Sequence, residues 1–109
     1  DMKSSNLPLN PTIKDYQKYI AEMMKVRGFD KNSIVEEMLI MTEEVGELAK
    51  VVRKAHGMHM DKNSVQSTAG EELADVFSFV LSIANYLDVD LEQAFRDKEE
   101  KNKKRTWEK

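Results

Sequence analysis

A pair of carboxylates, Glu44 and Glu47, stands where a surface helix ordinarily carries apolar side chains. Successive residues turn by about 100° around a helix axis, so the apolar residues Ile40 and Val51 project between the two acids. Charged residues of a surface helix normally lie on the face opposite its apolar stripe. We therefore expect this pair to face the interior of the protein or a groove.

A second pair, Glu72 and Asp75, repeats the arrangement on the next expected helix. If the two helices are antiparallel neighbours, all four acids meet. Two unit charges about 4 Å apart repel each other by on the order of 4 kcal/mol at an effective dielectric constant near 20. A bound cation removes that cost. Oxygen ligands select a hard ion, and a site with few protein ligands and room for water and phosphate suits Mg²⁺, with Mn²⁺ as a substitute. A single pair of this spacing is common on solvated helices, so it is the repetition that favours a metal site.

Capping signals and apolar periodicity predict four helices that position these acids. The first is expected from about Ile13 to Arg27, and the fourth begins at Asp90 and runs into the charged C-terminal segment. Two capping boxes predict the starts of the second and third helices. Their residues are Ser33 with Glu36 and Thr68 with Glu71.

Apolar residues in the second and third helices recur at the helical period and are expected to form the core. They are Ile34, Met38, Met41, Val45, Leu48 and Val52 in one and Leu73, Val76, Val80, Ile83 and Leu87 in the other, while Ser82 is expected on the polar face. No segment has the pattern of a strand. The sequence therefore predicts an all-α, antiparallel four-helix bundle-like domain.

The chain of 109 residues is expected to hold one helical domain, residues 12–109, after a flexible tail of residues 1–11; residues 57–66 are expected to form a loop. The net charge of −3 is weak and argues neither for a general nucleic-acid binder nor for a membrane-surface protein, so we expect neither a nucleic acid polymer nor a membrane as partner. No apolar run approaches the roughly 20 residues of a membrane span. The absence of cysteine excludes disulfides and thiolate metal sites and fits a cytoplasmic protein.

Read in order, the acidic segments resemble a known family. Glu43-Glu44-Val45-Gly46-Glu47 and Glu72-Leu73-Ala74-Asp75 are similar to the E-E-x-x-E … E-x-x-D signature of the MazG-like all-α nucleoside triphosphate pyrophosphohydrolases. Lys98, Asn102 and Arg105 are similar to the family's K-x-x-x-N-x-x-R. The resemblance covers nearly the whole chain from about residue 12. Each motif is weak alone, and the three in order are fairly specific.

The resemblance implies Mg²⁺-dependent hydrolysis of (d)NTP to (d)NMP and pyrophosphate, as in the removal of non-canonical or excess nucleotides. It implies that Glu44, Glu47, Glu72 and Asp75 hold the metal. It makes Glu43 a candidate base for the attacking water. Lys98, Asn102 and Arg105 would then contact the departing pyrophosphate or the nucleobase. Lys54, two turns beyond Glu47, is a further candidate for phosphate contact.

A chain of four helices has limited means of enclosing a nucleotide, so we expect a homodimer or homotetramer with the site near the subunit interface, as the resemblance also implies. Two alternatives stay open at this point. One is a non-enzymatic helical protein-interaction module, for which the seven methionines would suit partner binding. The other is a pyrophosphohydrolase acting on a phosphoribosyl-nucleotide. His56 and His59 are not part of an E-x-x-H motif, which argues against a ferritin-like di-iron protein.

Overall fold

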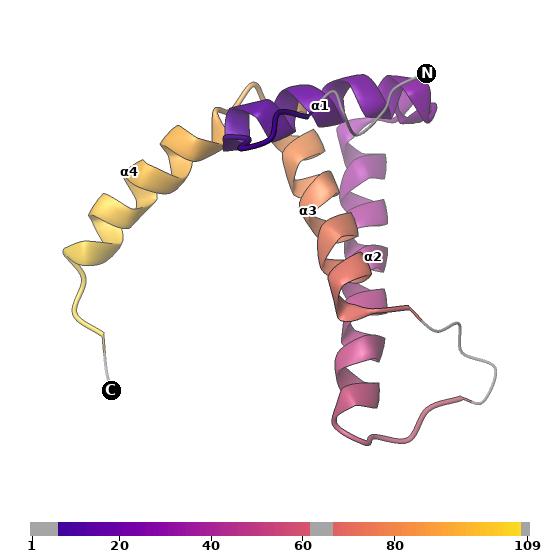
Figure 1. The fold of residues 1–109 in the computed structure, drawn as a ribbon. Helices are drawn as coiled ribbons and strands as arrows, with labels where there is room; N and C mark the ends of the chain where they lie inside the picture. Colours follow the sequence, from indigo (N-terminus) through magenta and orange to yellow (C-terminus); the bar gives the residue numbers. More distant parts are fainter. Residues whose placement is uncertain (1–6, 62–66, 108–109) are drawn as a thin grey trace.

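The computed structural model describes residues 7–61 and 67–107, and these ranges contain helices and connecting segments without a strand (Figure 1). The α-helices are α1 (Ile13–Val26), α2 (Ile34–Ala55), α3 (Ala69–Tyr86) and α4 (Leu91–Lys103), and a short 3-10 helix, η2 (Phe29–Lys31), follows α1. The predicted all-α class and the four predicted helices are confirmed; η2 was not predicted. The expected tail and loop lie partly outside the described residues, at 1–6 and 62–66.

Local sequence determines where the helices begin. Both predicted capping boxes are present at the starts of α2 and α3, and Thr12 with Asp15 forms a third at the start of α1. α4 begins with a simpler cap, in which the Asp90 carboxylate accepts a hydrogen bond from the Gln93 amide at 3.1 Å. Each cap satisfies a backbone amide that the helix itself leaves unpaired and stabilises the protein by about 1 kcal/mol.

Helices α2 and α3 lie side by side and antiparallel, and α1 packs across one end of this pair (Figure 1). The core forms at that end, where Ile20 and Met24 of α1 meet Phe79 and Leu81 of α3. The other ends of α2 and α3 lead into the segment that joins them. The α2–α3 pair therefore has one end that is closed by α1 and one that is not.

A buried glutamine holds the start of α4 against α1. The Gln17 side chain donates hydrogen bonds to the Asn85 side chain at 3.1 Å and to the Val89 carbonyl at 2.8 Å, and it accepts one from the Leu91 amide at 3.0 Å. Beyond this anchor α4 runs away from α2 and α3 (Figure 1). Within one chain the four helices therefore do not all lie side by side.

Several residues that were expected in the core are exposed in the single chain. On α2 these are Met38, Val45 and Val52, which are 45%, 46% and 48% exposed and follow one another at intervals of seven residues; we call them the α2 stripe. Leu73 on α3 and Leu87, the C-cap residue that follows α3, are more than half exposed. The apolar period was thus identified correctly, but the expected burial of these residues is wrong for one chain, because no other segment of residues 7–61 and 67–107 covers them.

Ser82 is the opposite case, since it was expected on the polar face of α3 and is only 3% exposed. A helical wheel assigns a polar residue to solvent when its partner on another helix is unknown. The described helices include none that is long and apolar enough to cross a membrane.

Candidate metal centre

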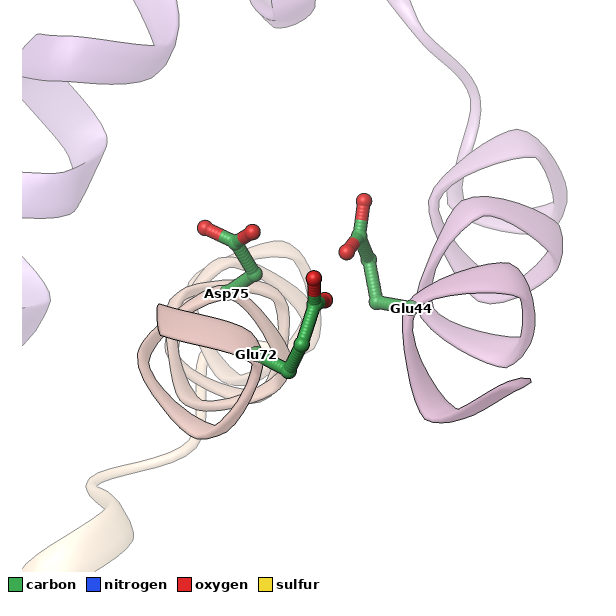
Figure 2. A group of neighbouring side chains, drawn as sticks. All are labelled: Glu44, Glu72 and Asp75. Carbon is green, nitrogen blue, oxygen red and sulfur yellow. The ribbon is translucent and has the colours of Figure 1, made fainter. Parts of the chain in front are cut away.

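Three carboxylates from two facing helices converge on one point between α2 and α3. Glu44 belongs to α2, and Glu72 and Asp75 stand one turn apart at the beginning of α3. One oxygen atom of each lies within 4.8 Å of the others, and in Figure 2 the Glu72 carboxylate stands between those of Asp75 and Glu44. The predicted meeting of acids from successive helices is therefore present for three of the four residues.

The three residues of the cluster differ in how far they are exposed to solvent. Glu72 is 7% exposed, and its Oε1 accepts a hydrogen bond from the Ser67 hydroxyl, while its buried Oε2 has no partner among the described residues. Asp75 is exposed, and Glu44 is half-buried. A buried oxygen without a partner is costly, and a hard cation would satisfy it. The all-oxygen donor set and the open side at Asp75 fit Mg²⁺ or Mn²⁺ with additional water or phosphate ligands. Ser67 was not singled out from the sequence.

The position of Glu44 makes this carboxylate easier to protonate than an ordinary glutamate when no metal is bound. Burial is the main reason that the pKa of Glu44 lies above its ordinary value, and the negative charges of Asp75 and Glu72 raise the pKa further. The charge of Glu47 acts in the same direction. A proton and a metal ion therefore compete for the same carboxylate.

This competition predicts a characteristic pH dependence. Affinity for Mn²⁺ is expected to fall on acidification through the raised pKa of Glu44, beginning at a higher pH than the value of about 4.3 for a free glutamate side chain. In the metal-free protein the folded state holds this proton more tightly than the unfolded state does. The corresponding stability is present at low pH and is lost as the pH rises through the raised pKa. Calorimetric titration with Mn²⁺ and thermal unfolding across this range measure the two effects.

A Glu44→Gln variant isolates the contribution of this carboxylate. The comparison is needed because capping hydrogen bonds lower the pKa values of Asp15 and Glu36. Their stability contribution has the opposite sign, since it is lost as the pH falls through those lowered values. If Mn²⁺ affinity did not depend on pH above the ordinary glutamate range, the raised pKa of Glu44 would have no role in metal binding.

Glu47 and Glu43 lie outside the group of three. Glu47 is 3.5 Å from the Lys50 Nζ, in a half-exposed pair three residues apart on α2. Its charge still contributes to the raised pKa of Glu44, so it borders the cluster. Glu43 is exposed on α2. The predicted roles of Glu47 as a ligand and of Glu43 as a base stay predictions. Lys50 was not predicted to pair with Glu47, although the two residues have the spacing of a helical ion pair.

The residues expected to contact substrate lie on the last turn of α2 and on or after α4. Lys54 and Lys98 are exposed. Asn102 donates from Nδ2 to Glu99 at 3.2 Å, and its buried Oδ1 has no partner among the described residues. The Arg105 guanidinium lies 4.3 Å from the centre of the Trp107 ring. Because α4 runs away from α2 and α3, a single chain does not gather these α4 residues around the carboxylates (Figure 1).

Comparison with known proteins shows to which protein family the chain belongs. The model of the MazG nucleotide pyrophosphohydrolase domain matches residues 30–108, a stretch that includes the three converging carboxylates and α4. The chain belongs to this family. It is similar to the uncharacterized protein YpjD of Bacillus subtilis (strain 168), with 34% identity over 87 residues that cover 76% of this chain and 76% of the relative. The family resemblance inferred from the motifs is thereby confirmed.

Proposed function

We propose that this protein is a Mg²⁺-dependent pyrophosphohydrolase that converts a (d)NTP to the (d)NMP and pyrophosphate and so removes non-canonical or excess nucleotides. The observation that carries the proposal is the convergence of Glu44, Glu72 and Asp75 between two helices, in a chain that belongs to the MazG nucleotide pyrophosphohydrolase family. Three acids at this distance repel one another, and the buried Glu72 oxygen lacks a partner, so the arrangement favours a bound divalent cation.

The proposed reaction assigns separate roles to the chain's own residues. Glu44, Glu72 and Asp75 would hold the metal, with Glu47 joining them after release from Lys50. When bound, Mg²⁺ offsets the charge of the triphosphate and orients it for in-line attack. Glu43 would accept the proton of the attacking water. Lys98, Asn102 and Arg105, with Lys54, would bind the phosphates and stabilise the charge that develops on the departing pyrophosphate.

The proposed active form is a homodimer or homotetramer. The radius of gyration of the chain is 16.7 Å, whereas a compact domain of 100 residues has about 13 Å. The excess reflects the divergence of α4, and the α2 stripe lies uncovered on the same chain. A second copy that covers the stripe and presents its own α4 to the carboxylates would complete the site and account for both features.

A panel of canonical and modified (d)NTPs with Mg²⁺ tests the reaction. We expect pyrophosphate and nucleoside monophosphate in equal amounts, with no turnover when EDTA is present. Release of orthophosphate alone would show that a different bond is cleaved. A chain that binds no Mg²⁺ and turns over no member of the panel would instead be the non-enzymatic helical module. Turnover of a phosphoribosyl-nucleotide and of no (d)NTP would show that the substrate is a phosphoribosyl-nucleotide instead.

A further inference from the structure

A second buried polar contact joins α2 to α3 away from the carboxylate cluster. Glu37 of α2 is 0% exposed, and Ser82 of α3 is 3% exposed. The Ser82 hydroxyl donates a hydrogen bond of 2.6 Å to the Glu37 Oε1. Neither residue belongs to the metal cluster or to the predicted substrate contacts. This is therefore a polar contact in the interior that the proposed reaction does not use.

Burial of the Glu37 carboxylate is expected to lower the stability of the protein, so stability does not explain why this residue is buried. Its Oε2 is buried and has no hydrogen-bond partner among the described residues, so the Ser82 bond satisfies only one of the two oxygens. Apolar residues of similar volume in place of a buried polar pair often leave a protein equally stable or make it more stable. Where such a pair is kept, a known benefit is that it fixes one alignment of two helices among several.

The alignment fixed here is the one on which the metal cluster depends. Glu44 follows Glu37 by seven residues on α2, and Asp75 precedes Ser82 by seven residues on α3. The helices are antiparallel (Figure 1), so Glu37 with Ser82 and Glu44 with Asp75 share one register. The two levels are about 10 Å apart along the helices at 1.5 Å per residue. A slide of one helix along the other would displace both pairs equally.

The side chains between the two levels do not fix this register by themselves. Ile40, Met41 and Phe79 pack there as part of the apolar core. Apolar contacts have no preferred direction, and methionine adapts to altered packing. A hydrogen bond of 2.6 Å, in contrast, is lost after a displacement of about 1 Å. The buried pair is thus a directional contact inside the α2–α3 interface at the end near α1, where the exposed Tyr86 hydroxyl also donates a hydrogen bond to the Asn32 carbonyl just before α2.

We propose that Glu37 is a positioning residue: its buried hydrogen bond with Ser82 fixes the register of α2 against α3 and thereby places Glu44 opposite Glu72 and Asp75. The inference rests on the proposed metal site for its functional consequence. The register itself is a property of the two helices and can be measured without metal.

The test compares the native chain with a Glu37→Met/Ser82→Ala double variant, which replaces the polar pair with apolar side chains. We expect the double variant to stay folded with an equal or higher melting temperature, and to bind Mn²⁺ about 10- to 100-fold more weakly, as for loss of other groups that orient metal ligands. Glu37→Gln is the conservative variant, because its amide oxygen can still accept the Ser82 hydroxyl, and it should retain native affinity. Ser78→Ala is the matched control, since among the described residues the Ser78 hydroxyl bonds only within α3, to the Ala74 carbonyl.

A distance measurement separates the register from the metal site. The sequence has no cysteine, so spin labels at Ala49→Cys on α2 and Ala74→Cys on α3 report one inter-helix distance in the metal-free protein. We expect a narrow distribution with native Glu37 and a broadened or shifted one in the double variant. Should the double variant unfold, Ser82→Ala alone provides the same two readouts.

An unchanged distance distribution would overturn the proposal, whatever the Mn²⁺ affinity, and native Mn²⁺ affinity in a chain with an altered distance would overturn its functional part. If the native protein bound no Mn²⁺ while the distance still depended on Glu37, the register would stand and the proposed metal site would be wrong.

Discussion

A Glu44→Gln variant is expected to lose more than about 100-fold of its hydrolytic activity, because even the loss of groups that only orient a metal ligand costs about 10- to 100-fold. The same change should stabilise the metal-free protein. It removes the negative charge that meets Asp75 and Glu72, which also raise the pKa of Glu44. With solvent screening this relief is on the order of 1 kcal/mol, or about 4–8 °C in melting temperature.

These opposite signs make the experiment informative. Pyrophosphate release and thermal unfolding in EDTA are measured on the same preparation, with Glu22→Gln, an exposed change on α1, as the control for loss of one negative charge. A general effect of net charge would raise the melting temperature in both variants. Activity within a few-fold of the native protein would remove Glu44 from the site, and a lower melting temperature would show that Glu44 contributes to stability rather than opposing it.

Mixing two inactive variants is expected to restore activity if α4 of one chain serves the carboxylates of another. The Glu44→Gln variant lacks one carboxylate but keeps Lys98, Asn102 and Arg105, which we call the α4 motif. The Arg105→Ala variant keeps the carboxylates but lacks one residue of this motif. About a quarter of the sites in a random mixture, and one of the two sites in a purified mixed dimer, would combine native carboxylates with a native Arg105. The reason to expect this is the divergence of α4 from α2 and α3 within one chain (Figure 1).

The design requires proof that the subunits exchange. The two proteins are co-expressed with different tags and purified through both, and light scattering gives the number of subunits. If verified mixed oligomers had no activity, the α4 motif would act within its own chain. A monomer at micromolar concentration would contradict the proposed oligomer itself.

What the sequence predicted well is local. Helix starts follow from side chains that bond to backbone amides three residues away, as at Ser33 and Thr68, so no knowledge of the rest of the chain is needed. The meeting of Glu44 with Glu72 and Asp75 required one more step, the antiparallel pairing of consecutive helices, which is the usual arrangement in a helix bundle. Periodicity and connectivity together therefore predicted most of the cluster.

What the sequence could not predict depends on partners that only the fold supplies. Glu47 can contact either Lys50 or the carboxylate cluster, and its spacing in the sequence does not show which of these contacts it makes. The burial of Ser82 depends on Glu37, which lies 45 residues earlier and opposite it on another helix. The α2 stripe shows the converse limit, because its apolar period indicates burial and does not say whether the same chain or another provides the cover.

The divergence of α4 also bears on how firmly that helix is formed. α4 has 13 residues, and isolated helices of about 12–15 residues are only marginally stable in water. Its start is held by Asp90 and by the contacts of Gln17, whereas Phe95 and the later turns are largely exposed. A surface that packs against the second half of α4 would then shift its helix–coil equilibrium toward the helix. Amide hydrogen exchange in residues 98–103 would accordingly report on association, fast in the separated chain and slow once another surface packs against the helix.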